Sequence, residues 1–344
     1  MIEKTIHIGP AFDGGMGSVI QGYIKLFGLP KENVWNSYKN GFIKSLPCLF
    51  AICFKILFKQ QKNIVCYQIH LASDGSIPRK LMIALCLRLR NRKFIVHLHG
   101  SKFQEHCLQR LLVRILVKLS DAVICITEQM KNFLEKENLK CRIFIIPNFC
   151  ETIAENPVDL RKHENPVKII FSGRFCQRKG TFDLLNAFEK ANFDAPAQLY
   201  LYGAGETEKL REIVKNSSKK DCISVNGWIA HDEYLKKLSG YDFLVLPSYA
   251  EVFPMSILEA MGVGLPVIST CVGGIPEMVE NNHSSILLNP RNMDELVNAL
   301  EKLVNNLDLR IEFSKNAWKD AKERFSPEII LRKLEDVYDQ VYER

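Results

Sequence analysis

The 344-residue sequence lacks most of the short signatures that mark a bound metal or a dinucleotide. Its eleven cysteines form no CxxC pair or other metal-ligand spacing, no Asp-x-Asp occurs, and no glycine-rich stretch matches GxGxxG. The cysteine count is odd and the chain is long, which argues against a disulfide framework and favours reduced thiols in a cytoplasmic protein. These absences disfavour an NAD-dependent enzyme.

Long apolar runs and a targeting segment are missing as well. The segment 42–62 reads FIKSLPCLFAICFKILFKQQK; its apolar part is too short to span a bilayer and contains Pro47 and Lys55. Met1–Pro10 reads as a β-strand and not as a signal peptide. With 47% hydrophobic and 25% charged residues, the composition is that of a soluble globular protein, and the length favours two domains.

Basic residues are concentrated in the first half of the chain. Residues 1–163 contain 24 Lys and Arg against 12 Asp and Glu, a net charge of +12, whereas residues 164–344 contain 22 against 27, a net charge of −5. Between Lys31 and Lys118 the balance is 16 basic to 3 acidic residues. Such a region indicates an anionic partner, for example a membrane surface, a phosphorylated lipid or a nucleic acid.

Short apolar strands alternate with helical patterns along the chain, which predicts parallel sheets with covered faces. In the first half, strands are expected at residues 2–8, 64–69, 94–98, 122–126 and 143–146, with the first helix at 18–27. In the second half, strands are expected at 167–172, 198–202, 223–226, 243–246, 266–270 and 285–288. The polar segment Glu151–Pro166 is the expected linker.

We therefore predict an α/β protein with two doubly wound, Rossmann-like domains that face each other across a cleft. The first domain is expected at residues 1–155 and the second at 164–326. A last helix at 327–344 is expected to pack back on the first domain. In such sheets, ligands lie outside the carboxyl ends of the strands.

The stretch from Pro247 to Glu277, PSYAEVFPMSILEAMGVGLPVISTCVGGIPE, has the features of an anion site. We place Pro254 in the first turn of a helix, where proline costs no hydrogen bond because amides of the first turn have no acceptor within the helix. The free amides at this helix start, backed by the positive end of the dipole, suit a diphosphate. These amides belong to Met255, Ser256 and Ile257.

Four charged residues in the same half of the chain accompany this helix start. Glu251 precedes the helix and Glu259 lies within it, so the two carboxylates are expected to contact different parts of a ligand. Arg174 and Lys179 fall in one strand-to-helix loop, where a guanidinium and an ammonium form a clamp that suits a diphosphate. Taken alone, the two cations read equally well as ordinary surface residues.

Two further strand ends carry residues of the kind that line ligand sites. Gly203, in YGAGE, allows a tight turn and close approach of the backbone to a ligand. Trp228 and Ile229 follow the next strand and are expected at the edge of a nucleobase. Packing of Trp228 in the core is the alternative.

The segments GRFCQRKG, YGAGE, VNGW and residues 247–277 together resemble the donor half of the family 4 glycosyltransferases. These are retaining enzymes of the two-domain GT-B architecture. The resemblance covers essentially the whole chain and is most specific over residues 173–277, where the spacing of Glu251 and Glu259 matches the E-x7-E signature. It implies a nucleotide-sugar donor, a metal-independent reaction and no cofactor.

The resemblance also implies roles for individual residues. Those expected at the donor are Gly15, Arg174, Lys179, Gly203, Trp228, Ile229, Glu251, Met255, Ser256, Ile257 and Glu259. The catalytic residues are expected to be His99, Arg174, Lys179 and Glu251. Arg174 and Lys179 would hold the diphosphate, together with the helix start. Glu259 would hydrogen-bond the ribose hydroxyls, and Glu251 would face the donor sugar or phosphate.

In the N-terminal half, the Gly14–Gly17 loop resembles the family's glycine loop over the donor phosphate. His99, in HLHG, matches the family's active-site histidine, although His97 shares its face and a lone histidine at a strand end is usually structural. His70 is a weaker candidate on the acceptor side. Residues 147–151, PNFCE, replace the usual Pro-Asn-Gly-Val-Asp, and we expect no effect on the chemistry.

The implied reaction moves a sugar from a UDP- or GDP-sugar to a glycan or lipid-linked saccharide in cell-surface polysaccharide biosynthesis. Attack on the front face of the sugar is expected, with the departing phosphate helping to deprotonate the acceptor. Lysines on the margins of segment 42–62 suit a helix lying in the membrane interface, and a core-facing amphipathic helix is the alternative. We therefore expect a cytoplasmic protein held peripherally at the inner face of an anionic membrane.

Other readings of the sequence fit less well. A sugar-nucleotide epimerase of the same architecture lacks the pair Glu251 and Glu259 in this form. A phosphorylase needs a pyridoxal-phosphate lysine and a much longer chain. A non-enzymatic polyanion-binding protein would use the basic first half, but aromatic residues are not interleaved with the basic ones, and we expect no nucleic-acid partner.

Overall fold

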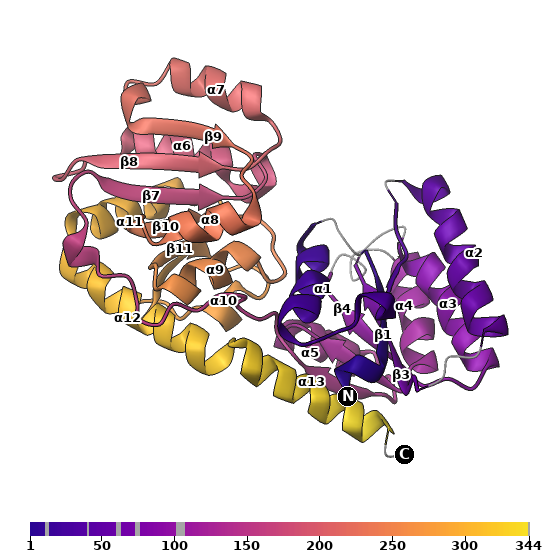
Figure 1. Cartoon of the computed structure of the whole chain (residues 1–344). Helices are drawn as coiled ribbons and strands as arrows, with labels where there is room; N and C mark the ends of the chain where they lie inside the picture. The colour runs from indigo at the N-terminus through magenta and orange to yellow at the C-terminus, as the bar shows by residue number, and fades with distance from the viewer. Residues whose placement is uncertain (11–13, 40, 60–62, 73–75, 101–106, 343–344) are drawn as a thin grey trace. The chain divides into compact units, whose positions relative to one another are not determined.

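The structure is a computed structural model that describes residues 1–10, 14–39, 41–59, 63–72, 76–100 and 107–342. The chain divides into two units, which are described separately: Met1–Phe149 with Pro327–Arg344, and Cys150–Ser326. Each unit contains one six-stranded parallel sheet with helices packed against it (Figure 1). The predicted α/β class with two doubly wound sheets is confirmed.

The sheet of the first unit has the strand order β2-β1-β3-β4-β5-β6. The strands are β1 Thr5–Gly9, β2 Val34–Asn36, β3 Cys66–Leu71, β4 Phe94–Leu98, β5 Ala122–Cys125 and β6 Arg142–Ile145. Every residue of β1, β3 and β4 is buried, as expected for central parallel strands covered on both faces. The register pairs His7 with Gln68 and His70 with His97, so polar side chains enter this core.

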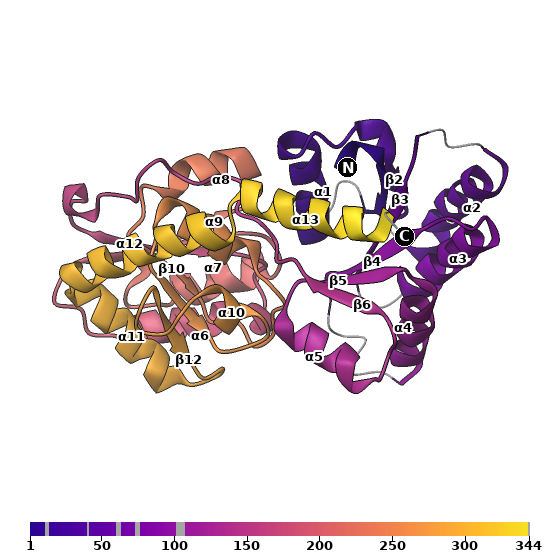
Figure 2. The same ribbon diagram turned by 90° about the horizontal axis from the view of Figure 1, so that it is seen from below.

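The helices of the first unit are α1 Gly14–Leu26, α2 Phe42–Phe58, α3 Ser76–Leu89, α4 Cys107–Leu119, α5 Glu128–Lys136 and α13 Pro327–Tyr342, with the short η1 Ile2–Lys4 and η2 Lys31–Asn33. Helix α3 packs between α2 and α4. Helix α13 begins at Pro327 and belongs to this unit (Figure 2). Its residues Ile330, Leu334 and Tyr338 are buried. Lys93 donates a 2.8 Å hydrogen bond to the carbonyl of Val341, near the end of α13.

The sheet of the second unit has the order β12-β11-β10-β7-β8-β9. Its strands are β7 Val167–Ser172, β8 Ala197–Tyr202, β9 Ile223–Gly227, β10 Phe243–Leu246, β11 Val267–Thr270 and β12 Ser285–Leu288. Its helices are α6 Thr181–Lys190, α7 Thr207–Lys215, α8 His231–Leu238, α9 Met255–Val263, α10 Ile275–Met278, α11 Met293–Asn305 and α12 Leu307–Arg324, with η4 Leu160–Lys162, η5 Gln177–Lys179 and η6 Lys220–Cys222. Among the described residues, no helix is both long enough and apolar enough to cross a bilayer.

Two expectations for the start of the chain are wrong. Residues 2–4 form η1, so the first strand begins at Thr5 and not at Ile2. The glycine-rich stretch Gly14–Gly17 is the first turn of α1 and not a loop before it. The helix lies close to the end of β1, because a Cβ added at Gly9 would come within 2.7 Å of Ile20.

The expected linker, Glu151–Pro166, packs on the second unit instead of standing free. Ala154 donates its amide to the carbonyl of Gly262 at 2.8 Å, and Val158 donates to Val263 at 3.0 Å, so the segment satisfies carbonyls at the end of α9. The indole of Trp318 on α12 donates to the carbonyl of Ala154 at 2.8 Å. The division therefore follows Phe149, earlier than the predicted end at 155.

Candidate functional site

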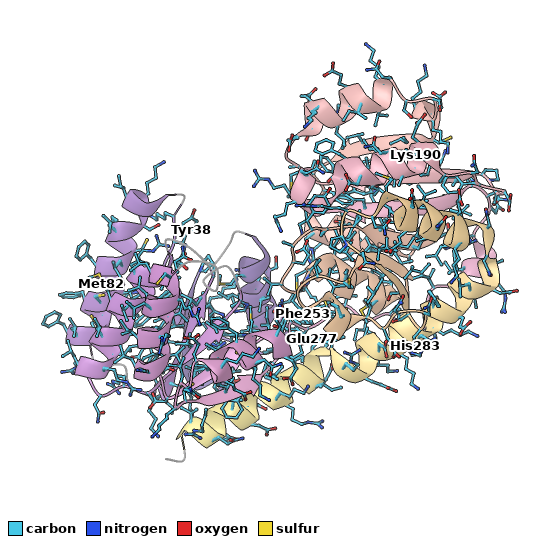
Figure 3. All side chains as sticks on the ribbon, turned by 180° about the vertical axis from the view of Figure 1, so that it is seen from behind. Tyr38, Met82, Lys190, Phe253, Glu277 and His283 are labelled. Carbon is cyan, nitrogen blue, oxygen red and sulfur yellow. The ribbon has the colours of Figure 1, made fainter. Side chains whose placement is uncertain are left out.

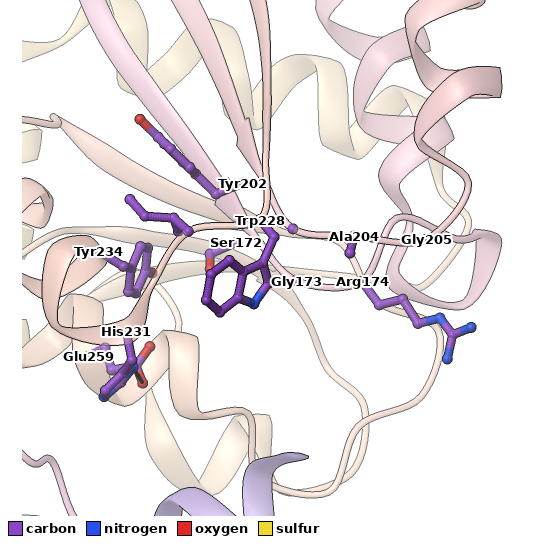
Figure 4. Close-up of a pocket in the computed structure, with 12 residues that line it drawn as sticks. Ser172, Gly173, Arg174, Tyr202, Ala204, Gly205, Trp228, His231, Tyr234 and Glu259 are labelled. Atoms are coloured by element: carbon purple, nitrogen blue, oxygen red, sulfur yellow. Dashed lines mark ion pairs between the residues drawn. The ribbon is translucent and has the colours of Figure 1, made fainter. Parts of the chain in front are cut away.

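A cavity of about 580 Å³ lies at the carboxyl ends of β7, β8 and β9 in the second unit (Figure 4). Its walls come from the three loops that follow these strands and from α8 and α9. Five of the residues predicted to contact a donor line it: Arg174, Gly203, Trp228, Ile229 and Glu259. This is the edge of a parallel sheet at which ligands are expected.

Glycines draw the loops after β7, β8 and β9 together. Gly203 has φ +151°, and a Cβ at this position would lie 1.8 Å from the carbonyl oxygen of Gly173. Its amide donates a 2.7 Å hydrogen bond to the carbonyl of Gly227. Only glycine permits this conformation and this approach. Backbone, not side chains, therefore forms this part of the cavity wall.

Trp228 presents an open aromatic face on the cavity wall. Its side chain is 76% exposed, so packing in the core, the alternative interpretation, is wrong. Figure 4 shows its ring at the cavity, which Ser172 and Tyr234 also line. An exposed ring of this kind can stack on a planar ligand group.

Glu259 on α9 is the buried carboxylate of the cavity, with 7% of the residue exposed. Its nearest cation is His231 at the start of α8, with 3.7 Å between Nδ1 and the carboxylate oxygen. Burial raises the pKa of Glu259 to about 7, His231 counteracts this, and Glu151 adds to it. The ionised form of this carboxylate is therefore costly at its buried position.

His231 bridges two carboxylates, and the sequence analysis missed it. Its Nε2 lies 3.3 Å from Glu151, on the opposite side from Glu259. The hydrogen bond with Glu151 raises the pKa of His231. Glu151, at the end of the PNFCE segment, is thus linked to the cavity through His231. The one available signal was the position of His231 directly after the Trp228 segment.

Lys179 and Glu251 form an ion pair next to the cavity, with 2.5 Å between their charged atoms. The side chains are 16% and 8% exposed, and Ser248 donates a 2.8 Å hydrogen bond to the same carboxylate oxygen. The pair joins η5 to the loop after β10. A second tie runs beside it, because the amide of Tyr249 donates to the carbonyl of Arg178 at 2.8 Å. The two predicted residues are thus brought together, but they do not line the cavity.

The start of α9 differs from the prediction in two ways. Pro254 is the N-cap, with ψ 122°, and the helix begins at Met255. The amide of Ile257 donates to the carbonyl of Pro254 at 3.2 Å and is therefore not available to a ligand. Because helix amides of the first turn have no partner within the helix, Met255 and Ser256 supply the amides that remain.

Arg174 lines the cavity, but its guanidinium group does not point into it. The residue is exposed, and Figure 4 shows its guanidinium pointing away from His231 and Glu259. Since no described contact fixes this guanidinium in the cavity, a diphosphate would have to recruit it. At the nearby Gly205, the backbone leaves no room for a side chain, because a Cβ there would lie 2.4 Å from the carbonyl oxygen of Phe175.

The remaining predicted residues belong to the first unit. Gly15 lies in the first turn of α1. His99 follows β4 and is half-buried, with its Nε2 2.9 Å from Nδ1 of His70. His70 and His97 are fully buried, so His70 does not offer the open side chain expected of an acceptor contact.

Comparison with known proteins gives the family. The protein family described as glycosyl transferases group 1 matches residues 152–320 of this chain. An uncharacterised glycosyltransferase of Methanocaldococcus jannaschii is 31% identical over 323 residues, which cover 89% of this chain and 87% of that protein. N-acetyl-alpha-D-glucosaminyl L-malate synthase of Bacillus anthracis is 26% identical over 299 residues, covering 82% and 76%.

A solved structure shows the same fold. The crystal structure of HepE from Anabaena in complex with UDP matches 98% of this chain and 99% of its own, with a TM-score of 0.76 and 16% identity. Its likeness extends over both units, so the fold expected from the sequence is that of a known GT-B protein. The chain belongs to the glycosyl transferases of group 1.

Proposed function

We propose that the protein is a retaining, metal-independent family 4 glycosyltransferase that uses a UDP- or GDP-sugar. The observation that carries the proposal is the cavity of about 580 Å³, which is lined both by the exposed ring of Trp228 and by the buried carboxylate of Glu259. A nucleoside offers a planar base to the first and ribose hydroxyls to the second. The UDP bound by the HepE structure supports a uridine nucleotide.

The diphosphate is proposed to meet Arg174, Lys179 and the amides of Met255 and Ser256. In the structure, Lys179 is paired with Glu251. A diphosphate would compete for the ammonium, and the Ser248 hydroxyl would still bond Glu251. Two cations and the start of α9 then stabilise the charge that builds on the leaving phosphate. This arrangement needs no metal ion.

The proposed transfer proceeds at the front face of the sugar. The bond from the anomeric carbon to the phosphate oxygen breaks, and a bond to the acceptor hydroxyl oxygen forms on the same face. The hydroxyl proton passes to the departing phosphate, so the nucleoside diphosphate leaves protonated. Glu251 and His99 are the proposed catalytic residues that orient the sugar.

The acceptor is proposed to be a glycan or lipid-linked saccharide of a cell-surface polysaccharide, reached at an anionic membrane. Ten of the thirteen exposed large apolar residues in the described part of the chain lie on α2, α3 and α4. They are Ile43, Phe50, Phe54, Phe58, Met82, Leu85, Leu89, Leu108, Leu111 and Ile115. We call these ten residues the apolar ridge; Figure 3 shows one of them, Met82, projecting outward. The three helices carry no Asp or Glu.

The nucleotide is tested first by thermal denaturation with UDP, GDP and a short DNA oligonucleotide. Stabilisation by one nucleoside diphosphate is expected, because a ligand that binds only the folded state raises its stability. Mass spectrometry of products from a panel of nucleotide sugars then identifies the sugar and the acceptor. Stabilisation by the oligonucleotide alone would replace this proposal with polyanion binding.

Variants test the assignment of residues. Lys179→Ala and Glu251→Gln are each expected to lower turnover by roughly 100-fold or more, because both alter the group beside the leaving phosphate. Glu251→Gln is chosen because it keeps an acceptor for the Ser248 hydroxyl. Lys162→Ala, at an 82% exposed lysine of the same unit, is the control. Wild-type turnover in both site variants would contradict the assignment.

A further inference from the structure

Three hydrogen-bonded histidines run across the sheet of the first unit and end at His99. His7 on β1 and His70 on β3 face each other with 3.0 Å between Nδ1 and Nε2. His70 then faces His99 with 2.9 Å between Nδ1 and Nε2. The ring centroids are 5.2 and 5.1 Å apart in the two pairs. We call His7, His70 and His99 the histidine chain.

The far end of the histidine chain touches the C-terminal helix. The hydroxyl of Tyr338 on α13 lies 3.5 Å from Nε2 of His7. The same hydroxyl donates a 2.5 Å hydrogen bond to Oε1 of Gln68, whose Nε2 lies 2.8 Å from Nδ1 of His97. Tyr338, Gln68, His7 and His70 are all buried, so water does not compete for these bonds. A residue near the end of the chain thus reaches His99 through two rings.

The rings of the histidine chain are neutral near pH 7. Burial lowers the pKa of His7 and of His99 to about 3, and that of His70 well below its ordinary value. A neutral imidazole has one N–H and one nitrogen lone pair. Each ring must therefore donate on one side and accept on the other. All hydrogen bonds of the histidine chain therefore point in the same direction along it. The nitrogen that carries the proton in one ring determines which nitrogen carries it in the next.

Tyr338 sets this direction. Its hydrogen is engaged by Gln68, so its oxygen accepts from Nε2–H of His7. The Nδ1 of His7 then accepts from Nε2–H of His70, and the Nδ1 of His70 accepts from Nε2–H of His99. We propose that Tyr338, His7 and His70 are positioning residues that hold His99 as the Nε2–H tautomer. Its Nδ1 is then an acceptor for a sugar hydroxyl.

This proposal rests on the proposed glycosyl transfer and narrows the contact that His99 makes. A hydroxyl donates to a nitrogen lone pair, whereas a phosphate oxygen only accepts. With Nε2–H committed to His70, His99 is suited to a saccharide and not to the diphosphate. The C-terminal helix, remote in sequence, supports this specificity through Tyr338.

A metal ion is the competing explanation for these histidines. His70, His97 and His99 each place one ring nitrogen within 4.8 Å of the others, as three zinc ligands do. However, Nδ1 of His70 and Nε2 of His99 are 2.9 Å apart, a hydrogen-bond distance. Two nitrogens bound to one tetrahedral zinc lie about 3.3 Å apart. The distance favours a shared hydrogen over a shared ion.

The tautomer of His99 is measured by nuclear magnetic resonance on the full-length protein with ¹⁵N-labelled histidine. Signals of His99 are assigned by their loss in His99→Gln. Wild-type protein is expected to show the Nε2–H form. Tyr338→Phe removes the oxygen that accepts from His7, so the direction is no longer fixed and the Nδ1–H form is expected to appear.

Kinetics supply the second measurement, as UDP release from the nucleotide sugar identified in the panel. Tyr338→Phe is expected to lower kcat by about tenfold or more while leaving the donor KM within twofold, because orientation at the reacting centre is lost and nucleotide binding is not. Val337→Ala is the matched control. It truncates a buried neighbour on the same helix without touching the histidine chain. It is expected to lower the melting temperature but to keep the wild-type tautomer and kcat.

The outcomes separate this inference from the proposed function. If His99→Gln transfers at the wild-type rate, the proposed role of His99 fails and the inference fails with it. If His99→Gln is inactive but Tyr338→Phe keeps the wild-type tautomer and kcat, the inference alone fails. An Nδ1–H form in the wild type also overturns it, as does a stoichiometric metal whose removal by a chelator shifts the His99 signals.

Discussion

Glu259 is a carboxylate whose ionised form is disfavoured by burial. Burial raises its pKa from the ordinary 4.5 to about 7, so its contribution to stability is complete below 4.5 and is lost as the pH rises through about 7. Glu259→Gln removes the titrating group. Above pH 7 the variant is therefore expected to exceed the wild type in unfolding free energy by up to about 3 kcal/mol. Urea unfolding at pH 5 and pH 8 measures the difference.

The same substitution is expected to weaken UDP binding about tenfold, since an amide replaces a charged acceptor for the ribose hydroxyls. Glu208→Gln, at an 86% exposed glutamate of the same unit, should change neither stability nor binding. A Glu259→Gln variant whose stability relative to the wild type is the same at both pH values would show that burial does not raise this pKa.

His231 is expected to tune the pH dependence of donor binding. It is the cation nearest to Glu259, and Glu151 on its other side raises its pKa. Removing the imidazole in His231→Gln takes away a positive charge that favours the ionised carboxylate, so the pKa of Glu259 rises further. UDP affinity is expected to rise with pH as Glu259 ionises, because the ionised group is the proposed acceptor for the ribose hydroxyls. Calorimetric titration with UDP between pH 6 and pH 9 should show this rise at a higher pH in His231→Gln than in the wild type.

The control for His231 is His163→Gln. His163 also pairs with a carboxylate in the second unit, with 3.2 Å between Nδ1 and Asp242, but it does not line the cavity. Its pH profile for UDP should match that of the wild type. A profile of His231→Gln that also matches would remove His231 from the donor site.

Residues of the cavity were predictable where one local pattern carried them. Trp228 and Gly203 follow strands directly, and the carboxyl ends of neighbouring parallel strands meet at one edge. The contact of His231 with Glu151 joins residues 80 positions apart, and it depends on how the supposed linker folds back on the second unit. The pairing of Lys179 with Glu251 was likewise invisible, because both were interpreted as ligands and not as partners of each other.

At the scale of elements, Gly180 locks η5 and α6 against the loop after β10. It has φ +69°, and a Cβ there would lie 2.0 Å from the carbonyl oxygen of Pro247. Gly180→Ala must therefore displace η5, which carries Lys179. The variant is expected to lose at least about 2 kcal/mol of unfolding free energy, and its turnover should fall along with the Lys179–Glu251 pair. Urea unfolding and UDP release measure the two effects.

Gly28→Ala is a matched control for the backbone conformation alone. Gly28 has φ +70°, but the nearest atom to an added Cβ is 3.8 Å away. It should lose about 1 kcal/mol, the general penalty for a side chain in this region. Equal losses in the two variants would mean that the contact with Pro247 does not constrain η5.

The elements that periodicity predicted well are those whose burial is nearly complete. Strands at 94–98, 167–172 and 243–246 have the predicted bounds, because buried central strands are continuous apolar runs between polar turns. The prediction missed β2 and gave no bounds for α5. Strand β2 has three residues at the sheet edge with one buried, and α5 buries only Met130 and Leu134. So few apolar positions do not form a recognisable period.

At the scale of the whole molecule, charge and apolar exposure are gathered on the same helices of the first unit. The apolar ridge lies on α2, α3 and α4, and exposed basic residues accompany it on or beside these helices. They are Lys44, Lys59, Arg90, Arg110, Arg114 and Lys118. Each basic residue near an anionic leaflet contributes about 1 kcal/mol, and salt screens this attraction. The ridge adds apolar contact that salt does not screen.

The full-length protein is therefore expected to co-sediment with vesicles that contain phosphatidylserine, and less so at high salt. The double variant Phe58→Ser with Leu89→Ser removes two ridge residues that are 72% and 78% exposed, and it should lower the bound fraction at every salt concentration. Leu307→Ser, at an exposed leucine of the second unit, is the control and should bind as the wild type does. At high salt, binding of the wild type and of the double variant could fall equally, to the level seen with neutral vesicles. This outcome would mean that charge alone holds the protein at the membrane and that the apolar ridge does not contribute. Binding of all three proteins to a DNA oligonucleotide but to no vesicle would remove the membrane from the proposed function.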